Sequence, residues 1–422
     1  MIARLHQLAT INLYALLLTA GIAPLVHRAT TAGVVSLRPI DGLLITFAGL
    51  MLLIWLTDRR LPPIQSPLAI VLLLFALWMF SSLINTQYLL LTVRRIGRIW
   101  LLLILVFGVQ TLQPSLKRIS QFLAAHALLQ SGVAIGQFLL GRGLNLRWLG
   151  ELELGENVLR IGDDIVLRAQ GLTEHPNLLA ILLVTSLFVM LAGLPKVHRW
   201  QQVSVIGILL VCSTALFFTF GRAATLGGMI AGGYLFIQLA LSPQGIASRR
   251  SRQLMLIGTG LLILTLGYTY RDVWLSRLTV GSSALEMLSI WERMVQNQIA
   301  VAMVQDYPLF GVGARNAQFL FAYYFEETRS ISTVIHSTVL LISAELGLIG
   351  GLLWLTILLY PIAYAIRHRK QLTRQQHILT AALAPYLIVD WTSPAAWDAP
   401  VGSLLRWLLL AVWLQSITKR KS

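Results

Sequence analysis

Arg222 is the residue whose surroundings most clearly suggest chemistry. It lies in Thr219-Phe-Gly-Arg222, where one apolar run ends and the next begins almost at once. A helix that starts at Arg222 directs its free N–H groups toward the same place as the guanidinium, and Gly221 relaxes the turn. This combination favours the binding of an anion at this turn. The structural alternative is an arginine that extends its charged end toward lipid head groups.

His336 is the candidate for proton transfer. It stands at the start of an apolar run, and Ser332 or Thr333 is expected to cap that helix. In the first turn the positive end of the helix dipole favours the neutral imidazole, which is the form that accepts a proton. The alternative is an interfacial histidine whose hydrogen bonds are satisfied.

Glu345, farther along the same run, places a carboxylate in hydrocarbon. Nine residues of helix put it on the opposite side from His336, so it should not orient the histidine. An acid within a membrane is costly, and we expect it to pair with a buried cation.

Arginines also occupy the segments that flank these positions. Arg160 and Arg168 precede Glu174-His-Pro-Asn177, and Arg293 follows Trp291 in a stretch where Met287, Trp291, Met294 and Val301 approximate one helical face. That stretch, which has the pattern of an interfacial helix, ends at Asp306-Tyr-Pro-Leu-Phe-Gly-Val-Gly, where proline and glycine force a turn. Guanidinium groups bind phosphate bidentately and keep their charge. A general preference of this chain for arginine over lysine is the alternative explanation.

The elements that must position these residues are membrane spans. The chain has 422 residues, of which 56% are hydrophobic and 12% charged, about half the charged fraction of a soluble domain, which is roughly 25%. This composition excludes a water-soluble fold and a disordered chain. A helix needs about 20 apolar residues to cross a bilayer. Twelve runs qualify: 10–26, 40–57, 65–84, 97–113, 119–141, 177–194, 203–220, 223–241, 254–270, 334–365, 376–393 and 402–417.

The charges between these runs predict the orientation. Alternate loops hold 17 basic residues, all five lysines among them, against one acid, Asp58. The positive-inside rule assigns this set and both termini to the cytoplasm, with the N-terminus kept as a first span and not a removed signal peptide. The other 16 basic and 16 acidic residues balance, so the net charge of +16 is a topology signal with attraction to anionic lipid. No nucleic-acid partner is required.

The predicted organisation has five parts. All cytoplasmic loops are short, so chemistry is expected on the outer face. The parts are spans one to five in 1–141, a first outer loop in 142–176, spans six to nine in 177–270, a large helical outer loop in 271–333 and the last three spans in 334–422.

Four segments together resemble the O-antigen ligase/polymerase superfamily of Gram-negative inner membranes. They are Arg168 to Asn177, Gly221-Arg222, Trp291 to Gly313, and His336-Ser337 with Glu345-Leu-Gly347. The resemblance covers about 160–355. One departure is Gly221, because many members carry serine at this position. The glycine lacks the serine hydroxyl, but the charge of the following arginine is kept.

The resemblance implies an all-α integral-membrane (GT-C-like) glycosyltransferase with about a dozen spans and one large periplasmic loop. Its donor would be an undecaprenyl-diphosphate-linked glycan, and the acceptor of the ligase branch would be lipid A–core. In this interpretation His336 is the general base, and the diphosphate is bound by Arg222 and Arg293 with Arg160 or Arg168 of the first loop. The activated donor needs no ATP. The outer face has no Asp-x-Asp motif, and the chain has no zinc-ligand spacing. We therefore expect arginine, and not a metal ion, to supply the positive charge for the diphosphate, and we expect no cofactor.

Three other functions stay open. A polymerase of the same superfamily shares the donor and extends lipid-linked repeat units, and another relative transfers glycan to a protein side chain. A transporter or flippase belongs to a different class. Inverted repeats and broken helices near the midplane are typical of transporters, and the chain has no internal repeat while its polar residues gather at the outer face.

Overall fold

The structure is a computed structural model that describes residues 1–19, 26–30, 33–59, 62–154, 158–161, 164–193, 199–240, 267–272, 275, 284–325 and 333–418. Its first half contains α1 (Ile2–Thr19), β1 (Val26–Thr30), β2 (Gly33–Leu37), α2 (Pro39–Asp58), α3 (Pro67–Trp78), η1 (Met79–Leu83), α4 (Leu89–Leu112), α5 (Leu116–Leu140), η2 (Arg147–Leu149), β3 (Val158–Ile161), β4 (Asp164–Leu167) and α6 (Pro176–Gly193). Its second half contains α7 (Arg199–Phe218), α8 (Arg222–Ala240), α11 (Ala284–Asp306), α12 (Ala317–Tyr324), α13 (Thr338–Arg367), α14 (Arg374–Leu383), α15 (Pro385–Thr392), α16 (Ala395–Asp398) and α17 (Pro400–Thr418).

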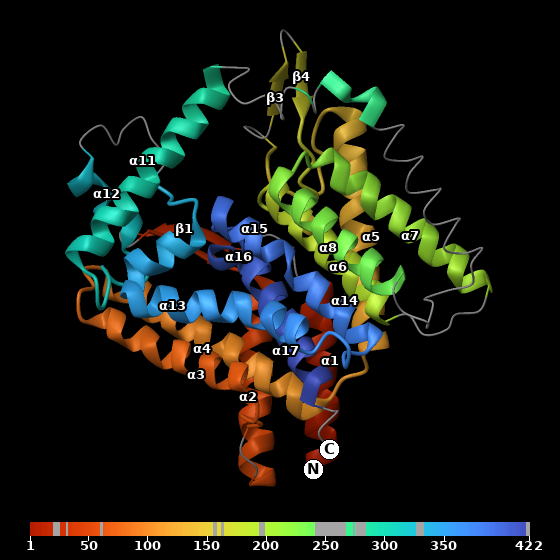
Figure 1. Cartoon of the computed structure of the whole chain (residues 1–422), viewed down its shortest axis with the longest axis horizontal. Coiled ribbons are helices and arrows are strands. Elements are labelled where there is room, and N and C mark those ends of the chain that lie inside the picture. Colours follow the sequence, from red (N-terminus) through yellow and green to blue (C-terminus); the bar gives the residue numbers. More distant parts are fainter. Residues whose placement is uncertain are drawn as a thin grey trace.

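Helices dominate the described chain, as the sequence predicts (Figure 1). Among the described residues, five helices are long and apolar enough to cross a membrane: α2, α5, α6, α13 and α17. This identifies an all-α membrane protein. The count of twelve spans, the sides on which the loops lie and the five-part division stay predictions, and the ninth run, 254–270, lies outside the described residues except for its end.

The start of α4 differs from the predicted run because buried charges find partners. The fourth run was expected at 97–113, whereas α4 already begins at Leu89. Two arginines in its first turns are paired inside the protein: Arg95 with Asp398, and Arg98 with Asp41 at 3.0 Å. These arginines lower the local hydropathy, so a run defined by hydropathy starts after them. Hydropathy does not take account of the acidic partners that make their burial possible.

Two antiparallel hairpins were not predicted. β1 pairs with β2 between α1 and α2, and β3 pairs with β4 within the predicted first outer loop. Both are short two-stranded units, so the all-α class of the protein stands.

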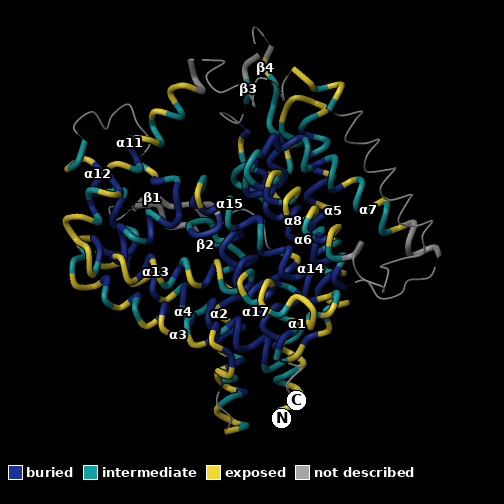
Figure 2. Tube along the Cα trace, in the orientation of Figure 1, coloured by how far each residue is buried: buried dark blue, intermediate teal, exposed yellow. Residues whose placement is uncertain are grey.

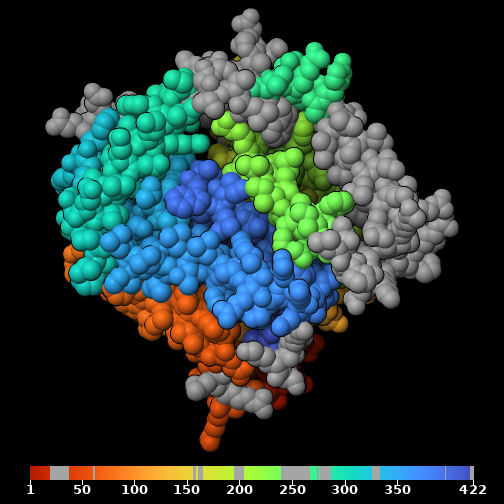
Figure 3. Space-filling model, in the orientation of Figure 1, coloured from red at the N-terminus to blue at the C-terminus, as the bar shows by residue number. Residues whose placement is uncertain are grey.

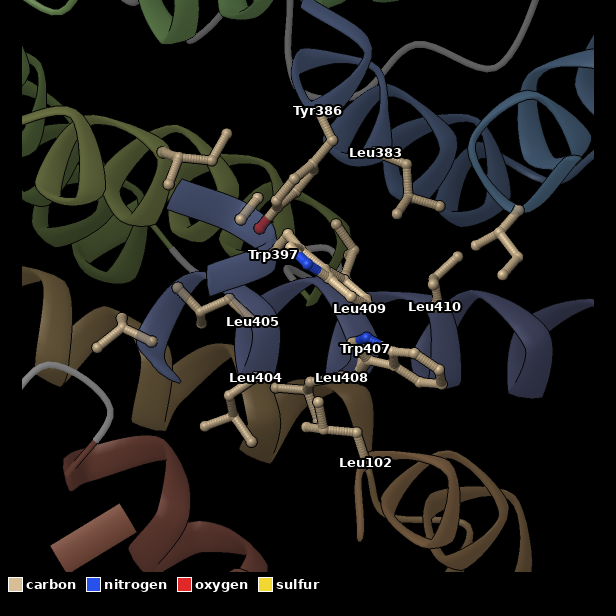
Figure 4. Close-up of a cluster of buried hydrophobic side chains, with 14 of the residues drawn as sticks. Leu102, Leu383, Tyr386, Trp397, Leu404, Leu405, Trp407, Leu408, Leu409 and Leu410 are labelled. Atoms are coloured by element: carbon tan, nitrogen blue, oxygen red, sulfur yellow. The ribbon is translucent and has the colours of Figure 1, made fainter. Parts of the chain in front are cut away.

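The core lies around α6 and α17, which are the most buried of the candidate spans (Figure 2). α17 packs against α4 on one side and against α14 and α16 on the other. Leucines and tryptophans of α17 meet Leu102 of α4, Tyr386 of α15 and Trp397 of α16 in one apolar cluster (Figure 4).

A buried ion pair lies in this core. Arg406 of α17 binds Asp390 of α15, and both side chains are almost fully buried. The other Asp390 oxygen accepts a hydrogen bond from Trp354 Nε1 at 3.0 Å. The Arg406 guanidinium lies 4.8 Å from the ring centre of Trp354 and 4.7 Å from that of Tyr386. Such partners offset the cost of two charges inside an apolar bundle.

α13 is broken at Gly347. That residue has φ 74° and ψ 179°, so the helix ends there and starts again at Leu348. The break leaves backbone groups without partners inside the helix. The Ala344 carbonyl accepts from Val312 N at 2.8 Å, the Glu345 carbonyl from Gly313 N at 3.1 Å, and Leu348 N donates to the Pro308 carbonyl at 2.8 Å. The Pro308–Gly313 segment therefore replaces the hydrogen bonds that the helix loses.

Glycines allow this close approach. A Cβ on Gly347 would collide with the Leu309 carbonyl, and a Cβ on Gly311, where φ is 66°, would collide with the backbone of Glu345. Trp78 Nε1 closes the break by donating to the Leu346 carbonyl at 2.9 Å. The Pro-Leu-Phe-Gly-Val-Gly and Glu-Leu-Gly motifs are thus the two halves of one contact.

We expect Gly347→Ala to destabilise the protein strongly. The backbone conformation costs a residue with a Cβ about 1–3 kcal/mol, and the Leu309 carbonyl must also move away. The measurement is the unfolding midpoint in detergent. Gly49→Ala on α2 is the matched control, because a Cβ there meets nothing within 4 Å. A Gly347→Ala protein as stable as the control would contradict the assigned role of the break.

Candidate active site

His336 lies directly before α13 and contacts α11. Its Nδ1 hydrogen-bonds Gln296 Oε1 at 2.7 Å. The helix cap differs from the prediction. Ser337, and not Ser332 or Thr333, caps α13 by accepting from Leu340 N at 3.4 Å. His336 therefore stands just outside the first turn, still at the positive end of the helix.

The contact with Gln296 defines the tautomer of His336. An amide oxygen only accepts, so the imidazole donates through Nδ1, and Nε2 of the neutral ring carries the lone pair. Burial, and after it the charge of Arg293, lower the pKa of His336, while a hydrogen bond to the backbone carbonyl of Val334 opposes them. The ring is therefore neutral and able to accept a proton at physiological pH.

Arg293 and Gln296 lie on the same side of α11. They are three residues apart, which places them on adjacent turns of one helical face. The apolar residues predicted to form the other face, Met287, Trp291, Met294 and Val301, are all exposed. The helix ends at Asp306, as the sequence predicts. α11 thus directs one polar face toward His336 and one apolar face outward.

The turn before Arg222 is held by Arg168. α7 ends at Phe218 and α8 begins at Arg222, which confirms the very short turn predicted from the sequence. Arg168 Nε donates to the Thr219 carbonyl at 3.0 Å, and its terminal nitrogen donates to Asn177 Oδ1 at 2.9 Å. Arg168 therefore connects the start of α6 to the turn that orients Arg222.

Gly221 serves this turn differently from the expectation. Phe220, with φ 48°, adopts the left-handed conformation, and Gly221 does not. A Cβ on Gly221 would lie 2.8 Å from Ala180 Cβ. The glycine is needed because α6 passes close by.

Two glutamines of α5 hold the segment that carries Arg168. Gln137 Oε1 accepts from Gly171 N at 2.9 Å, and Gln130 Oε1 accepts from Leu172 N at 2.8 Å. Sequence reasoning did not select either residue. The signal was present, because two amides seven residues apart in an apolar span lie on one face of the helix.

His175 is a further site residue that sequence reasoning did not select. Burial, then the charge of Arg168, and last the electrostatic effect of the neighbouring His336 ring on a second protonation, lower the pKa of His175 to about 4. His175 is thus electrostatically coupled to both parts of the site, the Arg168 segment and His336. Figure 3 shows this face of the molecule hollowed between α11, coloured teal, and α8, coloured light green.

Two other predicted residues, Arg160 and Glu345, form no described contact with His336, Arg168 or the turn before Arg222. Arg160 belongs to β3, where its backbone pairs with Ile165, and its side chain is outside the described residues. Glu345 is buried beside Arg95 and Arg315, and the backbone N–H of Arg315 donates to its carboxylate. Glu345 therefore has cationic neighbours of its own and does not contact His336 through a hydrogen bond.

Comparison with known families addresses the same part of the chain. Residues 207–355 match the family model described as O-antigen ligase. This match supports membership of the chain in the O-antigen ligase superfamily. The matched region contains Arg222, Arg293 and His336, while Arg168 and His175 lie before it. No curated protein matches the chain. Membership in the O-antigen ligase superfamily implies a glycosyltransferase-like membrane enzyme that acts on lipid-linked polysaccharide.

We expect Arg293→Gln to raise the pKa of His336. The nearby positive charge disfavours a second one, so its removal lets the imidazole take a proton at higher pH. The measurement is the titration of the His336 ring carbons by NMR in ¹³C-histidine-labelled protein, assigned from the resonance lost in His336→Gln. Arg147→Gln, which removes an exposed arginine paired with Glu153, is the control and should leave the titration unchanged. An unchanged or lower pKa in Arg293→Gln would refute the coupling.

Proposed function

We propose that this member of the O-antigen ligase superfamily is an O-antigen ligase. It transfers a polysaccharide from undecaprenyl diphosphate to a sugar hydroxyl of lipid A–core at the periplasmic face of the Gram-negative inner membrane. The observation that carries the proposal is the neutral His336, whose Nδ1 bonds to Gln296 and whose Nε2 is the basic nitrogen, beside Arg293. A sugar hydroxyl is a poor nucleophile and needs such a base.

The reaction is a direct displacement. His336 Nε2 takes the proton of the acceptor hydroxyl as its oxygen bonds to the anomeric carbon of the donor. The bond from that carbon to the phosphate oxygen breaks, and its electron pair leaves with undecaprenyl diphosphate. Attack from the face opposite the leaving group inverts the anomeric centre. The diphosphate bond is already activated, so the transfer uses no ATP.

Arginine supplies the positive charge that the leaving diphosphate needs. Arg222 begins α8, where the free N–H groups of the helix add to the attraction of its guanidinium for an anion. Arg293 stands beside the base. Arg168 holds the turn before Arg222 and adds its own charge, with Arg160 as a further candidate from the first loop. Fixed cationic donors at the leaving group stabilise the transition state, in place of a metal ion.

The test uses purified protein in lipid nanodiscs without ATP or added metal. Undecaprenyl-diphosphate-linked glycan is supplied with and without lipid A–core, and the products are resolved on a gel. The proposal requires a glycan-bearing lipid A band that depends on the acceptor. His336→Ala should lower its rate about 10²–10⁴-fold, the usual contribution of a general base, and leave donor binding largely intact.

Two other results would overturn parts of this proposal. Longer lipid-linked glycans that form without lipid A–core would identify a polymerase, and glycan on a protein acceptor would identify a protein O-oligosaccharyltransferase. Loss of donor binding together with transfer in His336→Ala would refute the general-base role.

Arg222→Ala should weaken donor binding about 10- to 100-fold, since a hydrogen bond to a charged group contributes about 1.5–3 kcal/mol. Arg222→Lys should also be impaired, because an ammonium lacks the bidentate fork. Binding of undecaprenyl-diphosphate-linked glycan is measured in nanodiscs, with Arg147→Ala as the control for loss of an exposed arginine. An unchanged donor affinity in Arg222→Ala would refute the diphosphate clamp.

A further inference from the structure

The tautomer of His175 is determined by its own turn. The backbone N–H of Asn177 donates to His175 Nδ1 at 3.1 Å. Since Nδ1 accepts, the proton of the neutral ring is on Nε2. His336 has the reverse arrangement, with Nδ1 donating to Gln296. The site therefore contains two neutral imidazoles. Nε2 of His336 can accept a proton, whereas Nε2 of His175 carries a proton and can donate a hydrogen bond.

Burial and a nearby arginine keep His175 uncharged. Its pKa of about 4 follows first from burial, then from the charge of Arg168, and last from the proximity of the His336 ring, since the two imidazoles disfavour each other's protonation. A neutral donor can stand among arginines without adding a repelling charge. Within the described residues, no protein group forms a hydrogen bond with Nε2 of this ring.

Hydrogen bonds and an ion pair hold the loop that carries the His175 ring. Thr173 Oγ1 donates to the Gln170 and His175 carbonyls at 2.7 and 3.1 Å. Glu174 is paired with Arg38, a side chain that is almost fully buried. The loop is thus fixed immediately before His175 by its own Thr173 and by Arg38, which comes from a distant part of the chain.

Asn177 connects His175 to the anion-binding elements. Its backbone N–H fixes the imidazole, and its Oδ1 accepts from Arg168, which in turn holds the turn before Arg222. These bonds form one continuous path from the ring of His175 to the turn that precedes α8. Arg168 also acts electrostatically on His175, so a group that binds Arg168 is expected to come near the histidine.

We propose that His175 is a substrate-binding residue whose Nε2–H donates a hydrogen bond to a diphosphate oxygen of the lipid-linked donor. This inference rests on the proposed function. It assigns His175 to binding of the leaving group, and it leaves proton transfer to His336.

Two substitutions separate this role from a purely structural one. His175→Gln keeps an N–H donor near the position of Nε2 and removes the acceptor for Asn177 N–H. His175→Asn keeps an acceptor near the position of Nδ1 and removes the distant donor. The probe is undecaprenyl diphosphate without glycan, and the readouts are its Kd in nanodiscs, the transfer rate and the unfolding midpoint.

Substrate binding predicts that His175→Asn raises the Kd for undecaprenyl diphosphate roughly 10- to 100-fold, while His175→Gln stays near the wild-type value. The opposite order would mean that the ring only caps the Asn177 N–H, and equal wild-type affinity in both variants would also overturn the proposal. A wild-type protein that binds undecaprenyl diphosphate and transfers glycan, with His175→Asn unimpaired, defeats this inference alone. A wild-type protein that neither binds it nor transfers glycan defeats the proposed function.

A measurement on the wild-type protein covers the case in which both variants unfold. The His175 Nε2–H is observed by ¹⁵N-histidine NMR before and after addition of undecaprenyl diphosphate. Donation to a phosphate oxygen should move this proton resonance downfield. A resonance that does not move would overturn the proposal.

Discussion

The break of α13 at Gly347 is the constraint on which the site depends. Carbonyls freed inside a membrane protein must find donors within the protein, because lipid offers none. Here the donors are Val312, Gly313 and Trp78, so the segment that follows α11 must return to the middle of α13. That return packs α11 against α13. It thereby brings Gln296, on α11, to His336, at the start of α13.

A second set of buried polar groups fixes the other side of the site. Gln130 and Gln137 of α5 hold the backbone of residues 170–172, and Arg168 extends from this segment to the Thr219 carbonyl. Each bond joins elements far apart in the chain. Buried amides that are fully bonded give a specific geometry, since any shift leaves a polar group unsatisfied. A site built this way presents fixed charges to its substrate, and electrostatic stabilisation needs charges that do not reorganise.

The sequence predicted what depends on local patterns. The starts of α6 and α8 and the end of α11 follow from apolar runs, proline and glycine. The sequence did not predict which residues that are far apart in the chain would pair. Gln296 is 40 residues from His336, and nothing in its own neighbourhood marks it as the partner of a histidine. The early start of α4 was missed for the same reason, because Arg95 and Arg98 read as polar until Asp398 and Asp41 are placed beside them. The residue types of the site were therefore predictable, and their pairing was not.

The arginines of this site act on the histidines as well as on an anion. Burial and then the charge of Arg293 lower the pKa of His336, and burial and then the charge of Arg168 lower that of His175, so both rings are neutral before substrate arrives. A bound diphosphate carries negative charge and reverses the sign of the local field. Under the proposed function, donor binding would raise the proton affinity of His336 at the moment when an acceptor hydroxyl must lose its proton. Departure of undecaprenyl diphosphate would lower that affinity again and release the proton, which returns the base to its neutral form for the next cycle.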